Sequence, residues 1–286
     1  MELSSYLQEK KIIIDKYLEE NLPLENQSPS IIHRSIRYSV LNGGKRIRPI
    51  LTLMTAELLG ENYTMVLPAA AGIELIHTFS LIHDDLPSMD NDDYRRGKLT
   101  NHKVFGEAIA ILTGDALLVM GLEFICKNAE IKGIKNNSII SAINYLLEML
   151  GTKKMLGGQV EDISWNNQED DDNFIENIYS KKTSALICAS LKTGAILSNA
   201  TKEQIDALQV YGEKLGLAFQ ITDDLLDLKE DKENNSKPTY PEIYGLEKAK
   251  KMVLLYSNQA KESISIFGEK ARLFHDLADF IVNRKK

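Results

Sequence analysis

Two clusters of aspartates contain the side chains whose types and spacing are best suited to chemistry. They occupy residues 83–90, with Asp84, Asp85 and Asp90, and residues 223–227, with Asp223, Asp224 and Asp227. Each cluster follows an apolar segment of helical character, where like charges repel by roughly 0.2–0.5 kcal/mol per pair. Carboxylate oxygens are the ligands that Mg²⁺ prefers, and phosphates of a substrate commonly complete its coordination shell. We therefore predict that a divalent cation is bound between the two clusters.

The second cluster forms one stripe along a predicted helix. Its three aspartates and Gln220 fall at positions i, i+3, i+4 and i+7, and the remaining positions are mainly Leu, Ile, Ala and Phe. A helix this apolar is buried on most sides, and buried carboxylates without partners are strongly unfavourable. A metal ion would supply the missing partner. An EF-hand calcium site is excluded, because its glycine and glutamate positions are missing.

The first cluster needs a break in its helix before its aspartates can share a metal. On an ideal helix Asp90 lies about 240° around the axis from Asp84, because each residue turns the helix by about 100°. Pro87 cannot continue a regular helix without losing a hydrogen bond, so it supplies the break. We predict a helix over residues 69–85 that delivers these acids to the mouth of a cleft. His77 shares a face with Asp84 on this helix, either as a ligand contact or as an ordinary core histidine.

A basic, glycine-rich stretch at residues 42–49 is a candidate anion site. Two glycines precede Lys45, Arg46 and Arg48, and Pro49 lies near the start of the next predicted helix. Free amides at a helix start favour anions, and Arg offers two parallel hydrogen bonds to a phosphate. A solvated basic turn is the alternative interpretation.

Three further polar groups are weaker signals when each is taken alone. The doublet Arg95-Arg96 beside the first cluster is either a set of surface ion pairs or, with a metal and a polyphosphate present, a second anion clamp. Gln159 and Asp162 lie one turn apart after two glycines, which indicates either an open polar face or a helix crossing relieved by glycine. Residues 181–183 (Lys-Lys-Thr) lie within a predicted amphipathic helix and carry no signal alone. The acidic run at residues 169–172 is interpreted as a helix N-cap region without a chemical role.

Composition limits the class of protein. The chain has 286 residues, 43% hydrophobic and 26% charged, which is typical of a globular protein. A net charge of −7 argues against nucleic-acid binding, which usually needs a basic face. Two cysteines, Cys126 and Cys188, are too few for a disulfide framework. No basic-then-apolar signal segment and no run of 18 apolar residues is evident, so we expect a cytoplasmic protein without a membrane span.

The spacing of apolar residues predicts an all-α fold. Residues 88–237 contain no proline, and apolar residues there recur mainly at three- and four-residue spacing. Short polar breaks, residues 199–201 among them, separate the segments, and no alternating β pattern is found. We predict one domain over residues 1–286, a bundle of about ten or more helices. Its first helix, over residues 3–20, is expected to pack on the outside of the bundle, since its mixed charges do not suit a membrane surface.

The motifs together resemble the trans-isoprenyl diphosphate synthases, the bacterial farnesyl type most of all. The resemblance runs from about residue 42 to residue 244, and its specificity comes from having both aspartate motifs and the basic motifs in the same order. The matching motifs are Gly43-Gly44-Lys45-Arg46-x-Arg48-Pro49, Asp84-Asp85-x-x-x-x-Asp90 with Arg95-Arg96-Gly97, Gly157-Gly158-Gln159, Lys182-Thr183 and Gln220-x-x-Asp223-Asp224-x-x-Asp227.

The resemblance implies an all-α homodimer with a deep central cavity, three Mg²⁺ ions and two diphosphate substrates. The metals would be held by Asp84, Asp85, Asp90, Asp223, Asp224 and Asp227. Isopentenyl diphosphate would be bound by Lys45, Arg48, His77 and Arg96, and the allylic diphosphate (dimethylallyl or geranyl) by Arg95, Lys182, Thr183, Gln220 and Lys237. The residues implied as catalytic are Asp84, Asp85, Asp90, Arg95, Lys182 and Asp223.

The resemblance also bears on product length. In this family bulk just before the first aspartate motif limits chain growth, and Phe79 and Ser80 stand five and four residues before Asp84. An aromatic residue there, with the two-residue insertion in the motif, resembles the bacterial farnesyl (C15) type, while smaller residues accompany the geranylgeranyl (C20) type. Ideal helix geometry places Phe79 about 140° around from Asp84, so its role depends on the resemblance alone.

Two departures and two other functions remain to be weighed. Leu99 stands where the family usually has proline, and the loop before Lys237 lacks the usual lysine-containing element, for which Lys229 and Lys232 are the two candidate substitutes. A terpene cyclase would normally carry a different second metal motif and lack the cations at residues 45 and 48. A non-catalytic synthase subunit should have lost an aspartate motif, and neither is lost.

Overall fold

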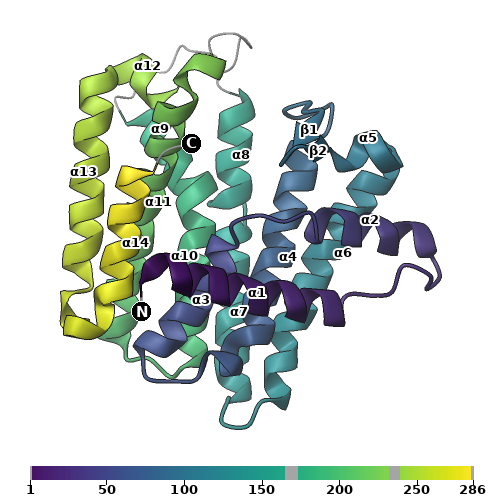
Figure 1. Ribbon diagram of the computed structural model, residues 1–286, viewed down its shortest axis with the longest axis horizontal. Helices are drawn as coiled ribbons and strands as arrows, with labels where there is room; N and C mark the ends of the chain where they lie inside the picture. The colour runs from purple at the N-terminus through teal and green to yellow at the C-terminus, as the bar shows by residue number, and fades with distance from the viewer. Residues whose placement is uncertain (1, 165–172, 232–238, 285–286) are drawn as a thin grey trace. The chain divides into compact units, whose positions relative to one another are not determined.

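The computed structural model describes residues 2–164, 173–231 and 239–284, with residues 227–231 described by their backbone alone (Figure 1). The predicted acidic cap at residues 169–172 lies outside these ranges. The chain divides into two compact units. The first comprises Leu3–Ile143 and Thr193–Asn199, and the second comprises Asn144–Lys192 and Ala200–Lys286.

The first unit contains most of the N-terminal helices. Their bounds are α1 (Leu3–Asn21), α2 (Ser30–Val40), α3 (Ile47–Leu58), the 3₁₀ turn η1 (Tyr63–Val66), α4 (Leu67–Asp84), α5 (Asn101–Phe105), α6 (Glu107–Cys126), η2 (Lys127–Glu130) and the start of α7 (Asn136–Leu150). A hairpin of two-residue strands, β1 (Tyr94–Arg95) and β2 (Lys98–Leu99), follows α4.

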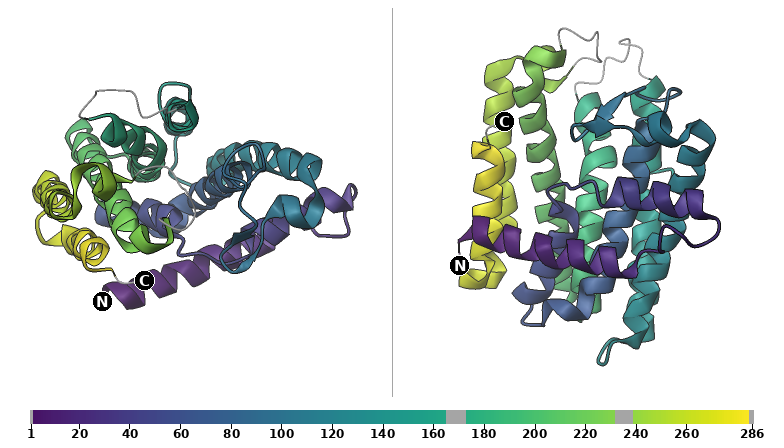
Figure 2. Two further views of the ribbon diagram at one scale, coloured as in Figure 1. Left: turned by 90° about the horizontal axis from the view of Figure 1, so that it is seen from above. Right: turned by 45° about the vertical axis from the view of Figure 1, so that its right-hand side comes forward.

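Helices α4 and α6 form the centre of this unit and lie side by side (Figure 2). Pro68 stands in the first turn of α4, where its missing N–H costs no hydrogen bond. A side chain at Gly72 would meet the carbonyl oxygen of Gly121 at 2.4 Å, so both glycines are needed for the close packing of the two helices. This packing holds the end of α4, where the first acidic cluster begins.

The second unit is organised around the long helix α11. Its elements are α8 (Met155–Ser164), α9 (Phe174–Tyr179), the π turn η3 (Ser180–Ser184), most of α10 (Ala185–Leu197), α11 (Lys202–Asp231), α12 (Tyr240–Tyr244), α13 (Leu246–Ser263), η4 (Ser265–Ala271) and α14 (Arg272–Asn283). Buried residues of α11 pack with α13 around Ile221, Ala249 and Val253. The hydroxyl of Tyr211 donates to the carbonyl of Phe274 at 2.8 Å and fixes α14 on α11.

The all-α prediction is confirmed, because the short hairpin at residues 94–99 is the only strand pair in the described part of the chain. The predicted helix over residues 3–20 is α1, and the helix predicted over residues 69–85 is α4. Both begin and end within two residues of the predicted bounds.

Two helical stretches are long and apolar enough to cross a membrane when judged by length and composition alone. They are Tyr63–Asp84 and Glu107–Glu130. The apolar window of the first is 72% buried inside the protein, which is typical of a core helix, while that of the second is 39% buried. Helix α6 therefore has an exposed apolar face. The cytoplasmic location and the lack of a membrane span stay predictions.

Candidate active site

The first acidic cluster lies where α4 stops. The helix ends at Asp84, and the N–H of Asp90 donates to the carbonyl of Asp84 at 2.9 Å. The N–H groups of Met89 and Asn91 both donate to the carbonyl of Leu86, at 2.9 and 3.1 Å. The chain therefore turns back on itself around Pro87 and brings Asp90 beside Asp84. This is the break that the sequence predicts.

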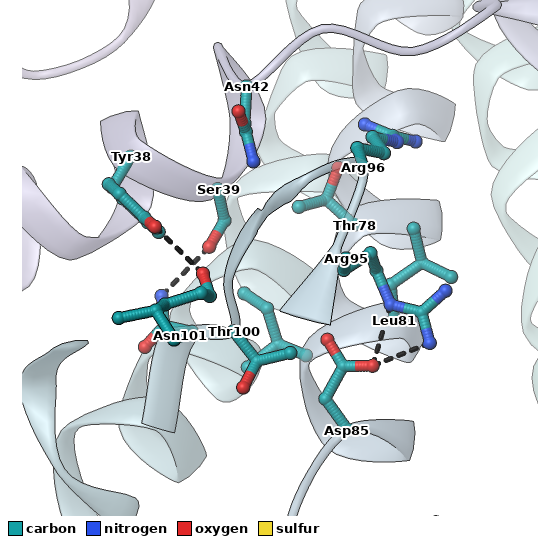
Figure 3. A pocket seen from close by; sticks show the side chains of 12 residues that line it. Tyr38, Ser39, Asn42, Thr78, Leu81, Asp85, Arg95, Arg96, Thr100 and Asn101 are labelled. Carbon is teal, nitrogen blue, oxygen red and sulfur yellow. Dashed lines mark hydrogen bonds and ion pairs between the residues drawn. The ribbon is translucent and has the colours of Figure 1, made fainter. Parts of the chain in front are cut away.

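The three acids of this cluster differ in their surroundings. Asp85 is 3% exposed, and Arg95 donates to its Oδ1 from Nε at 2.6 Å (Figure 3). Burial raises the pKa of Asp85, and the bond from Arg95 opposes that rise. Asp84 is half-buried and Asp90 is exposed. Asp85 therefore has its charge balanced by the protein, while the carboxylate of Asp90 faces solvent.

A small pocket adjoins Asp85. Its walls come from α2, α4 and the hairpin, and they include Asp85, Arg95 and Thr100 (Figure 3). The pocket encloses about 30 Å³, which is room for roughly two water molecules. Three of its lining residues, Asp85, Arg95 and Arg96, are also candidate metal and substrate contacts.

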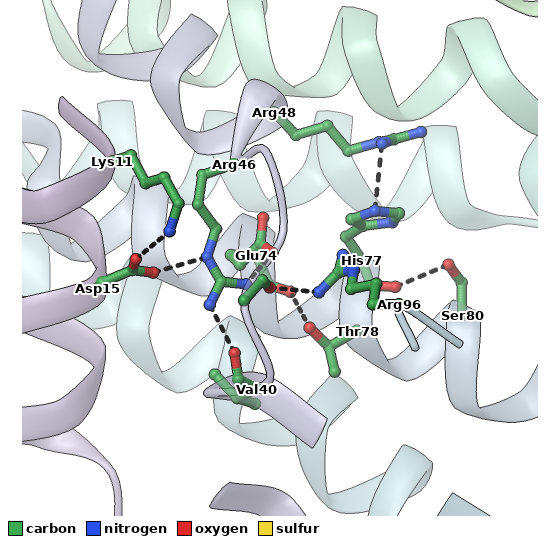
Figure 4. A network of polar contacts seen from close by, with 11 residues as sticks. Lys11, Asp15, Val40, Arg46, Arg48, Glu74, His77, Thr78, Ser80 and Arg96 are labelled. Atoms are coloured by element: carbon green, nitrogen blue, oxygen red, sulfur yellow. Dashed lines mark hydrogen bonds and ion pairs between the residues drawn. The ribbon is translucent and has the colours of Figure 1, made fainter. Parts of the chain in front are cut away.

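Arg46 of the basic stretch has a structural role that its sequence does not reveal. The residue adopts a left-handed conformation (φ +52°), which turns its side chain into the protein, where it is 1% exposed. Its guanidinium donates to Asp15 at 2.8 Å, to Glu74 at 2.5 Å and to the carbonyl of Val40 at 2.6 Å (Figure 4). Arg46, one of the three cations in this stretch, therefore links α1, α2 and α4.

Arg48 and His77 form a pair on neighbouring helices. Nη1 of Arg48 lies 3.2 Å from Nε2 of His77, and both residues are half-buried (Figure 4). Burial and the charge of Arg48 lower the pKa of His77 well below 6.5. His77 is therefore neutral at pH 7 and accepts the hydrogen bond. Burial also lowers the pKa of Arg48, to about 10, so Arg48 keeps its charge.

The two arginines of the hairpin point to different partners. Arg95 binds Asp85, whereas Nη1 of Arg96 donates to the carbonyl of Gly43 in the basic stretch. A side chain at Gly44 would lie 2.7 Å from the Arg96 guanidinium, and Gly44 has φ +121°, so glycine is needed there. Arg96 and Arg48 each lower the pKa of His77, which indicates a local excess of positive charge. These residues, together with exposed Lys45, form a candidate anion site.

The second acidic cluster lies on α11, and its first two acids have different partners. Asp224 is 6% exposed and accepts hydrogen bonds from the hydroxyl of Tyr179 at 2.5 Å, the amide of Gln220 at 3.3 Å and the N–H of Tyr240 at 3.1 Å. Asp223 is about one-third exposed and pairs with Arg284. The described part of the chain does not include the side chains of Asp227 and Lys229. It also does not include Lys232 and Lys237.

The Lys-Lys-Thr run lies in the π turn η3, a local widening of the helix that is frequent at functional sites. Nζ of Lys182 lies 2.9 Å from Asp162, the residue that the sequence places one turn after Gln159. The hydroxyl of Thr183 donates to Gln220 at 2.8 Å. The structure therefore brings Lys182, Asp162, Thr183 and Gln220 together within the second unit.

Phe79 and Ser80 lie on α4 before the first cluster. Phe79 is 7% exposed, and its ring packs edge-to-face against His83 at 5.0 Å. His83 is itself fixed by a 3.1 Å contact with the carbonyl of Ile111. The hydroxyl of Ser80 donates to the carbonyl of His77.

Sequence reasoning missed the roles of Tyr179 and Arg284. Each contacts an aspartate of the second cluster from 45 or more residues away, and no local pattern marks such a contact. Glu74, the partner of Arg46, did leave a signal. It is a lone acid in an otherwise apolar helical segment, which indicates a buried charge pair.

Comparison with known proteins gives consistent results. The family model for polyprenyl synthetase matches residues 29–266. A geranylgeranyl diphosphate synthase of Cyanophora paradoxa is 42% identical, with 99% of this chain and 96% of that relative covered. A farnesyl diphosphate synthase of Bacillus subtilis is 37% identical over 99% of this chain and 98% of the relative.

Solved structures agree with the sequence relatives. The apo crystal structure of an FPP/GFPP synthase from Zymomonas mobilis superposes with a TM-score of 0.89 and 35% identity, and covers 98% of each chain. The crystal structure of a geranyltransferase from Legionella pneumophila has the same TM-score, 0.89, at 30% identity, and covers 99% of this chain and 96% of its own.

Proposed function

The chain belongs to the polyprenyl synthetase family and is a short-chain trans-prenyl diphosphate synthase, and from this premise we propose that its product is farnesyl diphosphate. The observation that carries the proposal is the bulk of Phe79, a buried aromatic ring five residues before Asp84 and held against His83. A fixed ring at the position that limits chain growth in this family favours a C15 over a C20 product.

Geranylgeranyl diphosphate is the second candidate product. It is favoured by relatives that carry this activity in their names and are 42% and 40% identical to this chain. The two candidate products differ by one round of condensation. Enzymes that make them would therefore share the same catalytic residues and differ only in the depth of the pocket that holds the growing chain.

We propose that isopentenyl diphosphate binds at Lys45, Arg48, His77 and Arg96. Support comes from the positive charge gathered there and from neutral His77, which orients the Arg48 guanidinium by accepting a hydrogen bond. Arg donates to diphosphate oxygens in pairs, which fixes orientation as well as charge. We propose that Arg95, Lys182, Thr183, Gln220 and Lys237 bind the allylic diphosphate.

Mg²⁺ fits the donors that the two clusters offer, because all are carboxylate oxygens, and a backbone hydrogen bond from Asp90 to Asp84 brings the main chain of these two residues together. Among the described residues no three acidic, histidine or cysteine side chains form a ready-made metal group. We propose that Asp84, Asp85, Asp90, Asp223, Asp224 and Asp227 hold three ions. Bound Mg²⁺ would stabilise the negative charge that develops on the departing diphosphate.

The chain's own residues have three tasks in this reaction. Arg95 and Lys182 stabilise charge on the leaving diphosphate oxygens. Lys45, Arg48 and Arg96 hold isopentenyl diphosphate so that its alkene is aligned with C1 of the allylic substrate. Apolar residues exclude water, which would otherwise capture the allylic cation. The C–O bond to diphosphate breaks, the new C–C bond forms, and loss of a proton restores the double bond.

We propose that the chain acts as a homodimer through α6. Ile111, Leu112 and Val119 on this helix are 44%, 53% and 65% exposed, an apolar surface that a second copy would cover. Light scattering after size-exclusion chromatography should give twice the 32.2 kDa mass of the chain. Val119→Asp should reduce that mass to one chain, and a monomeric wild type would contradict the proposal.

The decisive test is an incubation of the purified protein with radiolabelled isopentenyl diphosphate and each allylic diphosphate, with and without Mg²⁺. A magnesium-dependent C15 product that accumulates is the expected result. Continued growth to C20 would replace the product assignment with the second candidate. The absence of any elongated product would overturn the enzymatic proposal itself.

A further inference from the structure

Arg284 lies against the second acidic cluster, although it follows the last described helix of the chain. Its side chain is 6% exposed and pairs with the carboxylate of Asp223 on α11. The guanidinium carbon lies 4.6 Å from the centre of the Phe219 ring, one helical turn before Asp223. An ion pair and a cation–π contact therefore hold the same side chain.

The position of Arg284 is set by the helix before it. Phe274, Leu277 and Ile281 of α14 are each 2% exposed or less, and the Tyr211 hydroxyl binds the Phe274 carbonyl. This anchoring fixes the register of α14 and delivers Arg284 to α11. The contact is thus a consequence of the packed core and not of an isolated surface pair.

Arg284 is poorly solvated where it lies. Within the described residues neither its Nε nor its Nη2 has a hydrogen-bond partner, so the contact with Asp223 is an ion pair alone, and burial lowers the pKa of Arg284. A desolvated guanidinium with an unsatisfied donor is stable there chiefly because of the Asp223 charge. The same carboxylate oxygen cannot face both this cation and a divalent metal, because the two positive charges would repel at close range.

We propose that Arg284 is a tethered counter-ion that occupies Asp223 in the metal-free enzyme and has to be displaced before a divalent cation binds there. This inference rests on the proposed function, in which Asp223 is a metal ligand. It assigns to Arg284 the control of metal entry at the second cluster, and it couples metal occupancy to the position of the segment after α14.

The proposal is tested by measuring Mn²⁺ binding to the full-length protein with electron paramagnetic resonance of the free ion. Arg284→Gln removes the competing charge and should tighten binding about 3- to 10-fold, the range expected for losing a partly exposed ion pair with a cation–π contact. Phe219→Leu removes the aromatic contact without changing net charge and should tighten binding by a smaller factor.

Arg272→Gln is the matched control for net charge. Arg272 lies on α14, is 75% exposed and pairs only loosely with Asp276 at 3.9 Å. It should leave Mn²⁺ affinity unchanged. Equal tightening in Arg272→Gln and Arg284→Gln would show a long-range charge effect and overturn the proposal, as would an Arg284→Gln affinity equal to that of the wild type.

A second measurement follows Arg284 itself. Trypsin cleaves the peptide bond after residue 284 only when the Arg284 side chain enters the specificity pocket of trypsin. Pairing of Arg284 with Asp223 should therefore slow this cleavage. Mass spectrometry should show faster cleavage there when Mg²⁺ is added, and no change in the rate would contradict displacement. If the wild type binds no Mn²⁺ at all, the metal site of the proposed function is wrong. If the wild type binds Mn²⁺ and Arg284→Gln binds it equally well, only the role of Arg284 is wrong.

Discussion

The Glu74–Arg46 pair offers the sharpest prediction about how this site is built. Both side chains are 1% exposed, and Glu74→Ala would leave the Arg46 guanidinium buried with Asp15, which is 34% exposed, as its remaining acidic partner. Breaking a buried ion pair by removing one partner costs about 3–5 kcal/mol. Because Asp15 stays in place, we expect a loss near the lower end, about 3 kcal/mol.

This loss should be visible in both stability and substrate binding. For a chain of this size about 3 kcal/mol corresponds to a fall in Tm of roughly 5–10 °C, measured by differential scanning calorimetry. Arg46 also fixes the left-handed turn between Gly44 and Arg48. We therefore expect the KM for isopentenyl diphosphate to rise about 10-fold, while the KM for the allylic substrate changes little.

Glu57→Ala is the matched control. Glu57 also joins α1 to α3, through Lys10 at 2.7 Å and the Tyr6 hydroxyl, but it lies near the end of α3 opposite to the basic stretch. It should lower Tm without raising the KM for isopentenyl diphosphate. A Glu74→Ala enzyme with wild-type Tm and KM would refute the structural role of Arg46, and an equal KM increase in both variants would refute its specific link to the anion site.

Two further predictions concern His77 and Phe79. The pKa of His77 is held well below 6.5, so as pH falls below about 6.5 the unfolded chain binds a proton at His77 that the native state does not bind. The contribution of His77 to the free energy of unfolding is therefore complete above about pH 6.5 and is lost as pH falls below it. Urea unfolding at pH 7.5 and pH 5.5 should show a smaller pH dependence in His77→Gln, and an unchanged difference would contradict neutral His77. Phe79→Ala removes the ring five residues before Asp84 and should lengthen the product on chromatography; an unaltered product distribution would refute its role in chain length.

Much of the fold follows from local signals in the sequence. Apolar spacing predicts α1 and α4 nearly to their ends, and the polar break at residues 199–201 falls between α10 and α11. Asn199 has φ +55°, a conformation that Asn tolerates better than most residues. Pro87 likewise predicts the end of α4, because the loss of a backbone hydrogen bond is a local effect.

The partners of the site residues could not be predicted in the same way. Lys45, Arg46 and Arg48 look alike in sequence, but the left-handed turn at Arg46 sends its side chain to Glu74 and Asp15. Local spacing does not encode which of three neighbouring cations turns inward. The π turn at residues 180–184 and the contact of Arg284 with Asp223 depend on packing between distant segments, which periodicity does not report.

Three acids near the proposed site are paired with cations of the same protein, and one of these pairs couples metal binding to diphosphate binding. Asp85 is held by Arg95, Asp162 by Lys182 and Asp223 by Arg284. Under the proposed function Asp85 is a metal ligand and Arg95 binds diphosphate, so metal binding at Asp85 would release a cation that the substrate needs. Linkage requires the converse, that diphosphate favours metal binding by the same factor. The Asp85–Arg95 pair thus makes simultaneous binding of metal and diphosphate more favourable than binding of either alone.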